Sequence, residues 1–323
     1  MRTVFLLFFL AGACVAEAEN SLANLQRTLL FGREYIRMTE WARANKIDLK
    51  WVGPIKEKEL RATNETTRIF FTMDSYKAQI NGINFTLSLP VVLQKKNVYI
   101  SAVDLQISLQ PLLFPEKMAT NAAIKTICLD PGHGGEDPGK MDGRMEEKKF
   151  TLLLSEEVER LLKKSGFNVV RTRTRDQTVK LPERPTIANR NEADLFISLH
   201  YNAAPKRTVE GVEVYCLTPA GTLSSSGGKF APSYPGHSHD RRNTLLAYEM
   251  QKSLVKNLGV DDRSVKRSQF VVLLTAKMPA ILIEGGFMTN PADARRIYDS
   301  EYRKRMASAI VNGILAYQKI VEK

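Results

Sequence analysis

Residues that commonly hold metals or form cross-links are scarce in this chain. Its 323 residues include only 3 cysteines and 4 histidines. Cys128 and Cys216 lie in apolar, strand-like runs, and neither has the flanking pattern of a metal site. We therefore expect two buried free thiols, unless the two strands lie close enough for a disulfide. The sequence offers no cysteine-based metal centre.

A hydrophobic run of membrane-spanning length is also missing from the N-terminus. The apolar stretch from Val4 to Val15 is too short for a permanent membrane span. It follows a basic start and ends in the small-x-small triplet Ala16–Ala18, which predicts a signal peptide over residues 1–18. We expect an exported protein, in the periplasm or at the cell wall. Lipid attachment at Cys14 is disfavoured because Ala11 stands where a branched aliphatic residue is expected.

Acidic residues are outnumbered, with 35 Asp and Glu against 47 Lys and Arg, and the net charge is +12. Such a charge is compatible with simple solubility, but it also favours an anionic polymer through long-range attraction. No helix-turn-helix, zinc-finger or RNA-binding motif accompanies the charge, so we expect no nucleic-acid partner. For an exported protein, the available polyanion is the cell wall or the membrane surface.

One of the few histidines lies in the most distinctive stretch, Thr126–Gly139, which has the sequence TICLDPGHGGEDPG. An apolar run ends at Asp130–Pro131 and leads into a glycine-rich segment around His133, the pattern of a buried strand followed by a tight loop. We expect the flanking glycines to let a metal or a large ligand approach the imidazole. This places His133 in a functional loop.

Three further residues are expected beside His133. Glu147 begins an amphipathic helix that ends near Gly166. His200 and Glu284 each end an apolar run of the kind that is buried in a parallel sheet. Because ligands bind beyond the carboxyl ends of such strands, we expect a mostly parallel α/β sheet with these side chains in one crevice.

Two histidines and two carboxylates form a complete set for a catalytic zinc site. His133, Glu147 and His200 are the predicted ligands, and the fourth position is left to water. Glu284 is then the predicted general base. Two alternatives are a wall-binding protein without catalysis and a cysteine hydrolase that uses Cys128. The first does not need an open metal site, and no exposed turn presents Cys128 as a nucleophile.

Six segments of the C-terminal 200 residues or so resemble, in order, the zinc-dependent N-acetylmuramoyl-L-alanine amidases of the type-3 amidase family. The segments are LDPGHGGEDPG, EEKKFTLLLSEEVERLL, ADLFISLHYNA, GVEVYCL, DRSVKRSQFVVL and PAILIEGGFMTNPAD. The resemblance implies a Rossmann-like fold, one zinc ion and cleavage of the amide between the lactyl group of N-acetylmuramic acid and L-alanine in peptidoglycan.

The same resemblance implies roles for individual residues. The family's ligand histidines fall on His133 and His200, and its catalytic glutamate falls on Glu284. Its ligand glutamate is usually followed directly by lysine, which favours Glu147 over the adjacent Glu146.

Substrate contacts are expected beside this centre. Asn202 follows His200 by two residues and is expected either to position substrate or to orient the zinc ligand. Arg263 and Lys266 approach the site in the family's pattern and are predicted to meet substrate carboxylates, with a solvated face as the alternative. The segment Thr218–Asn243 contains the other two histidines, but its Gly, Ser and Pro content favours a polar loop that borders the groove without blocking it.

Residues 19–121 have a different character from the predicted catalytic domain, residues 122–323. Helical patterning from Leu25 to Arg43 gives way to short alternating runs, and Asn81–Gly82 is a strong hairpin signal. We expect a small mixed α+β domain rich in strands. The segment Ser75–Leu113 resembles the copper amine oxidase N-terminal-like domain, and the absence of histidine there implies no copper. Docking to the cell wall is its predicted role, with a simple folding appendage as the alternative.

Overall fold

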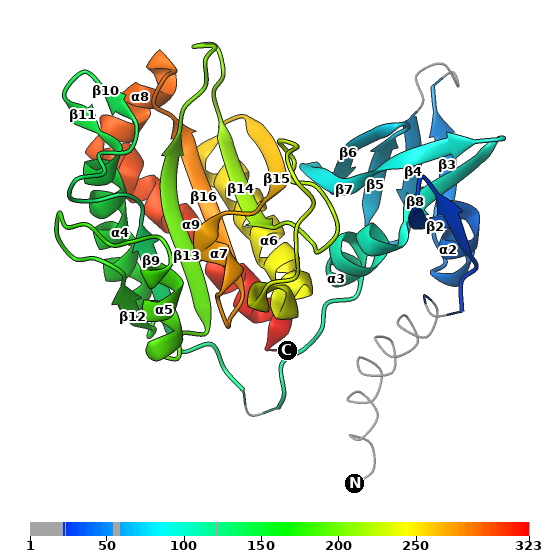
Figure 1. Ribbon diagram of the computed structural model, residues 1–323, viewed down its shortest axis with the longest axis horizontal. Coiled ribbons are helices and arrows are strands. Elements are labelled where there is room, and N and C mark those ends of the chain that lie inside the picture. Colours follow the sequence, from blue (N-terminus) through cyan, green and yellow to red (C-terminus); the bar gives the residue numbers. More distant parts are fainter. Residues whose placement is uncertain (1–21, 23, 54–58, 121, 323) are drawn as a thin grey trace, which may run out of the picture. The chain divides into compact units, whose positions relative to one another are not determined.

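The computed structural model describes residues 22, 24–53, 59–120 and 122–322 (Figure 1). The predicted signal peptide, residues 1–18, lies outside the described residues. Contacts divide the chain into two compact units, the first ending at Glu116 and the second beginning at Lys117. Within the described ranges, no helix combines the length and the apolar character that crossing a membrane would require.

The N-terminal unit is built mainly from antiparallel strands. Neighbouring strands pair in the order β3-β4-β5-β6-β7, and β8 joins β7 to the β1–β2 hairpin. The Asn81–Gly82 hairpin is confirmed: both residues have positive φ, and Ile80 pairs with Ile83 across the turn. The elements are β1 (Arg27–Leu30), β2 (Arg33–Arg37), α2 (Met38–Ala44), β3 (Asp48–Val52), β4 (Glu59–Thr63), β5 (Arg68–Thr72), β6 (Ser75–Ile80), β7 (Ile83–Gln94), β8 (Asn97–Ser101), the π-helix η2 (Asp104–Leu109) and α3 (Gln110–Leu113).

The helix expected from Leu25 to Arg43 is wrong over most of its length. β1 and β2 form a hairpin there, and only Met38–Ala44 is helical. The two residues of the turn, Phe31 and Gly32, have φ of 51° and 72°, the conformation that two-residue hairpin turns require. Gly32 between two short apolar runs was the available turn signal.

The C-terminal unit contains a six-stranded sheet in the order β12-β9-β13-β16-β14-β15. The first four strands are parallel, whereas β14 runs antiparallel to β16, and β15 runs parallel to β14. This confirms a mostly parallel α/β sheet. The strands are β9 (Thr126–Pro131), β12 (Asn168–Arg171), β13 (Leu195–Asn202), β14 (Val212–Leu217), β15 (Asp262–Ser268) and β16 (Ala280–Phe287).

Helices cover both faces of this sheet (Figure 1). On one face, α9 (Ser300–Val321) packs between α4 (Glu147–Lys164) and α6 (Asp240–Leu258). On the other face, α5 (Glu183–Arg190) and α7 (Val271–Leu274) contact each other over a core that includes Phe196 and Leu282. A short hairpin of β10 (Met141–Asp142) and β11 (Met145–Glu146) precedes α4, the 3₁₀ helix η3 (Pro235–His239) precedes α6, and α8 (Pro291–Tyr298) follows β16. Burial on both faces explains the near-continuous apolar runs of β13 and β16.

Hydrogen bonds connect the residues just before β9 to the end of the C-terminal helix, α9. Lys117 donates from Nζ to the carbonyl of Ile320, and the amide of Ile124 donates to Glu322. The contact boundary at Lys117 therefore lies a few residues before the predicted boundary at residue 122.

Candidate metal centre and catalytic cavity

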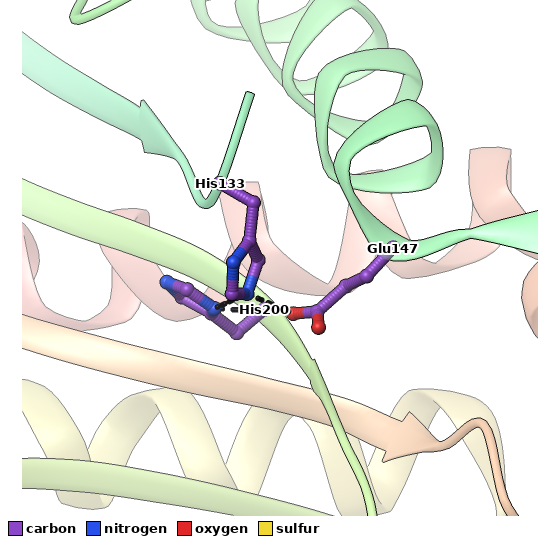
Figure 2. Close-up of side chains that lie close together, drawn as sticks. All are labelled: His133, Glu147 and His200. Carbon is purple, nitrogen blue, oxygen red and sulfur yellow. Dashed lines mark hydrogen bonds and ion pairs between the residues drawn. The ribbon is translucent and has the colours of Figure 1, made fainter. Parts of the chain in front are cut away.

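Three side chains from separate elements converge at the carboxyl edge of the parallel strands. His133 lies in the loop after β9, Glu147 is the first residue of α4, and His200 lies near the end of β13. Figure 2 shows the two imidazoles and the carboxylate directed toward one another. The adjacent Glu146 instead forms an ion pair with Lys148.

The donor set of these three side chains suits a zinc ion. Glu147 Oε1 lies 3.0 Å from His133 Nε2 and 3.1 Å from His200 Nδ1, and the two ring nitrogens are 3.2 Å apart. Ligands at about 2.0–2.2 Å from a tetrahedral zinc lie roughly 3.3–3.6 Å from one another. The three atoms lie slightly closer together than that, so they would move apart by a small distance to hold such an ion.

Hydrogen bonds fix which atom each side chain presents. His133 Nδ1 lies 2.8 Å from Asp137 Oδ2, so it donates its proton there and leaves Nε2 for a metal. Glu147 Oε1 accepts from the amide of Tyr201, and its Oε2 accepts from the amide of Lys140. Such outer partners orient metal ligands and set their basicity.

Gly132 makes room for the second imidazole rather than for an incoming ligand. A Cβ added at Gly132 would lie 2.2 Å from His200 Cε1. Gly139 has a similar role, since a Cβ there would lie 2.6 Å from both Glu147 Oε2 and His133 Cδ2. Gly132 and Gly139 thus allow the three side chains to pack together, whereas a Cβ at Gly134 or Gly135 would meet Arg173, Gln177 or Thr178.

Two buried arginines hold the loop that carries His133. Arg184 donates to Asp130 and to the carbonyls of Pro131 and His133, and Arg173 donates to the carbonyls of Pro131 and Gly132. Arg184 thus has a structural role. Arg173 was not anticipated because it lies in RTRTRDQ, which resembles a solvated run of charge.

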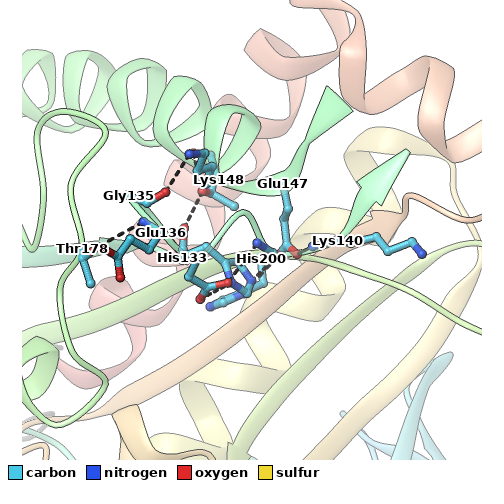
Figure 3. Close-up of polar contacts among 12 residues, drawn as sticks. His133, Gly135, Glu136, Lys140, Glu147, Lys148, Thr178 and His200 are labelled. Carbon is cyan, nitrogen blue, oxygen red and sulfur yellow. Dashed lines mark hydrogen bonds and ion pairs between the residues drawn. The ribbon is translucent and has the colours of Figure 1, made fainter. Parts of the chain in front are cut away.

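Two further hydrogen bonds hold the other side of the same loop. Lys148 donates to the carbonyl of Gly135, and Thr178 Oγ1 accepts from the amide of Glu136 (Figure 3). The loop is therefore fixed by hydrogen bonds along its length, which holds the imidazole of His133 in place.

Glu284 shares a cavity of about 490 Å³ with the three clustered side chains. It pairs with His200 across β13 and β16, and its Oε2 is buried without a hydrogen-bond partner in the described part of the chain. An orphaned buried carboxylate oxygen is uncommon and is typical of a functional group. Besides these residues, the cavity is lined by Lys140, Leu181, Tyr201, Asn202, Ala203, Phe270, Val271, Val272 and Leu282.

The pKa values of the two carboxylates in the cavity are shifted in opposite directions. Burial raises the pKa of Glu284 well above its ordinary value, the negative charges of Glu147 and Glu213 raise it further, and Lys266 opposes them. For Glu147, burial also favours the protonated form, but the neighbouring imidazoles of His133 and His200 outweigh it and hold the pKa below its ordinary value. Glu147 is therefore the carboxylate of the cavity that favours ionisation, and Glu284 is the one that favours the bound proton.

The predicted substrate residues converge on a glutamate that sequence reasoning missed. Asn202, Arg263 and Lys266 all hydrogen-bond to Glu213, which is 2% exposed. Only Asn202 of these three lines the cavity. Glu213 lies near the start of β14, whereas ligand-binding residues were expected at the ends of strands.

The remaining histidines lie outside the cluster. His237 accepts from the amide of Tyr234 and lies 2.9 Å from the carbonyl of Thr218, so both ring nitrogens are used within the loop. Among the described residues, the His133, Glu147 and His200 group is the one with metal-binding spacing. No residue of Thr218–Asn243 is among those that line the cavity.

Both described cysteines are free and fully buried, as expected. Burial raises the pKa of the Cys128 thiol, which disfavours the thiolate that a nucleophile requires. Full burial and the raised pKa of its thiol argue against Cys128 as a nucleophile.

Comparison with known proteins gives one consistent family. The family model described as N-acetylmuramoyl-L-alanine amidase matches residues 127–316, which include all four cavity residues discussed above. The chain is 39% identical over 193 residues to the uncharacterized protein YqiI of Bacillus subtilis, covering 60% of this chain and 84% of that protein. It is 34% identical over 195 residues to the Bacillus subtilis N-acetylmuramoyl-L-alanine amidase LytC, covering 60% of this chain and 36% of LytC.

Solved structures agree with these matches. An N-acetylmuramoyl-L-alanine amidase from Clostridium difficile 630 superposes with a TM-score of 0.52 at 31% identity, covering 61% of this chain and 98% of that chain. The amidase AmiC2 of Nostoc punctiforme gives the same TM-score and identity, covering 62% of this chain and 99% of that chain. The region of this chain that matches each structure is about as long as the C-terminal unit.

Proposed function

This chain belongs to the N-acetylmuramoyl-L-alanine amidase family, and on that premise we propose that it is a zinc-dependent cell-wall hydrolase. Its substrate is peptidoglycan, and the bond cleaved is the amide between the lactyl group of N-acetylmuramic acid and L-alanine. The observation that supports this most directly is the group of His133 Nε2, Glu147 Oε1 and His200 Nδ1, within 3.2 Å of one another and in one cavity with Glu284.

The proposed division of labour follows from the contacts. His133, Glu147 and His200 hold zinc, which when bound lowers the pKa of a water molecule and polarises the scissile carbonyl. Glu284 takes the proton of the attacking water at its unpartnered Oε2 and then delivers that proton to the alanine nitrogen as the amide breaks. A raised pKa makes the carboxylate of Glu284 a stronger base for the first of these steps.

Two substitutions test these assignments. Glu284→Gln keeps the shape of the side chain but cannot accept the proton, so zinc content should stay at one per chain while turnover falls about 10²–10⁴-fold. His133→Ala removes a ligand and should lose both zinc and turnover. Elemental analysis and release of stem peptides from peptidoglycan measure the two quantities on the same sample. Near-full activity of Glu284→Gln would show that the base is misassigned.

A further inference from the structure

Glu213 is held by four side-chain donors beside the catalytic cavity. Its carboxylate accepts from Asn202 Nδ2 at 3.1 Å, Tyr215 Oη at 2.7 Å, Arg263 Nε at 2.9 Å and Lys266 Nζ at 2.5 Å. A buried carboxylate with two cations and two neutral donors is compensated for its lost hydration. Its position is therefore fixed before any substrate binds.

Glu213 lies in one row with the catalytic residues. It pairs with Glu284 across β14 and β16, and Glu284 pairs in turn with His200 across β13. Residues directly opposite each other on paired strands point to the same face of the sheet. The side chain of Glu213 is therefore on the face that carries the metal ligand and the proposed base.

A bulge in β15 brings both cations to this carboxylate. Arg263 and Lys266 are three residues apart, and in a regular strand residues three apart point to opposite faces. The β14–β15 register shifts between Val212 and Val214, and Ser264 has a φ of 89°, a costly conformation for a residue with a side chain. The irregularity resets the alternation, so that Arg263 and Lys266 both reach Glu213. The strained backbone of Ser264 thus lies in the bulge that brings Arg263 and Lys266 to Glu213.

Hydrogen bonds to Glu213 and Ala203 determine the orientation of the Asn202 side-chain amide. Asn202 Oδ1 accepts from the amide of Ala203 at 2.7 Å, and Nδ2 donates to Glu213. The Ala203 amide can only donate, and the carboxylate beside two cations accepts, so a flipped amide would lose both bonds. The second N–H of Nδ2 has no partner in the described chain, and Asn202 lines the cavity together with His200 and Glu284.

We propose that Asn202 donates this second N–H to a carbonyl oxygen of the peptide beside the cleaved amide, and that Glu213 is the positioning residue that directs it. This inference rests on the proposed function and adds a substrate contact to it. Arg263 and Lys266 then act through Glu213, which they hold in place. Their direct contact with substrate carboxylates stays a separate prediction.

The test measures binding in the zinc-loaded Glu284→Gln chain, which should retain its substrate. The probe is N-acetylmuramoyl-tripeptide, and calorimetry gives its dissociation constant. Asn202→Ala should raise that constant about 5–20-fold, as expected for one lost hydrogen bond to a buried peptide group. Glu213→Gln should raise it by a similar factor when Asn202 is present and by less than about twofold when residue 202 is alanine.

Glu249→Gln is a matched control, because Glu249 is also buried and ion-paired, with Lys252 on α6, but does not line the cavity. It should leave the dissociation constant unchanged. Additive effects of the Asn202 and Glu213 substitutions would overturn the positioning role. Should Glu213→Gln fail to fold, Asn202→Ala still decides, because this half-buried position tolerates truncation and an unchanged dissociation constant would overturn the contact.

This design separates the inference from the proposed function. If the unmodified chain cleaves no peptidoglycan but the coupling between Asn202 and Glu213 is measured in binding, the proposed hydrolysis fails and the inference stands. If the unmodified chain cleaves the amide and Asn202→Ala binds the probe as tightly as its parent, the inference fails alone. Absence of any binding to the zinc-loaded Glu284→Gln chain overturns the inference as well.

Discussion

His133, a proposed metal ligand, has a backbone conformation that is unusual for a residue with a side chain. Its φ is 61°, in the left-handed region, where histidine is less disfavoured than most residues. The carbonyl of His133 is held by Arg184, and the two carbonyls before it are held by Arg184 and Arg173. These bonds offset the strain and fix the direction in which the imidazole points.

Gly132→Ala should damage the metal centre without altering any ligand. The added Cβ would lie 2.2 Å from His200 Cε1 and 2.4 Å from its Nε2, so the ring must move. We expect zinc affinity to fall at least about 10–100-fold, the range seen when the support of a metal ligand is lost. Competition with a chromogenic chelator measures the affinity.

Gly143→Ala is the control for this substitution. A Cβ at Gly143 meets no atom within 4 Å, although its φ of 59° makes alanine unfavourable by about 1–2 kcal/mol. This variant should lose some thermal stability and keep its zinc affinity. Zinc affinity in Gly132→Ala equal to that of the unmodified chain would contradict the packing described for His200.

At the scale of elements, the direction of β14 explains why Glu213 was missed. The rule that ligands bind at the carboxyl ends of parallel strands led to His200 and Glu284, which both line the cavity. β14 is antiparallel to β16, so its beginning, not its end, lies at the catalytic edge. Strand direction depends on how the chain returns to the sheet, and the local pattern GVEVYCL does not contain that information.

Elements with strong local signals were predicted well. The helix that begins at Glu147 and the Asn81–Gly82 hairpin are both present. Interactions between distant segments were not predictable. The contact of Arg173 with the His133 loop spans about forty residues and depends on tertiary structure.

Asp240, the first residue of α6, should make the free energy of unfolding depend on pH. Burial raises the pKa of Asp240 to about 6 from 3.8, although Arg267 and His237 oppose the shift. The folded chain therefore binds this proton more tightly than the unfolded chain does. The stabilisation from the proton is complete below about pH 4 and is lost as the pH rises through about 6.

Asp240→Asn should remove this dependence, because the amide stays neutral. Relative to the unmodified chain, the free energy of unfolding of the variant should rise between pH 4 and pH 7 by up to about 3 kcal/mol. Urea unfolding of both chains, with chelator present so that metal release does not contribute, gives the difference. A difference that is constant across this pH range would refute the raised pKa.

At the scale of the whole molecule, the N-terminal unit has its own core and need not take part in catalysis. Trp41 and Phe71 are fully buried in it, and the matched family region begins only at residue 127. We propose that this unit docks the enzyme to the cell wall. The net charge of +12 is consistent with an anionic polymer as the partner.

Removal of the N-terminal unit should separate docking from catalysis. A chain that begins at Lys117 should cleave soluble muropeptides with a kcat/KM within about twofold of the longer chain, because the residues that line the cavity all follow that position. Its co-sedimentation with purified cell walls should fall. Equal co-sedimentation of the two chains would leave the unit as a folding appendage.

Mass spectrometry of digested peptidoglycan shows whether this chain cleaves the lactyl–alanine amide with zinc. Purified peptidoglycan is incubated with the chain from Glu19 onward, alone, with a zinc chelator, and with chelator followed by excess zinc. We expect stem peptides with a free L-alanine amine in the first and third samples and none in the second. Release that persists in the chelated sample would contradict the zinc mechanism, and no release from a chain shown to contain zinc would contradict the hydrolase assignment.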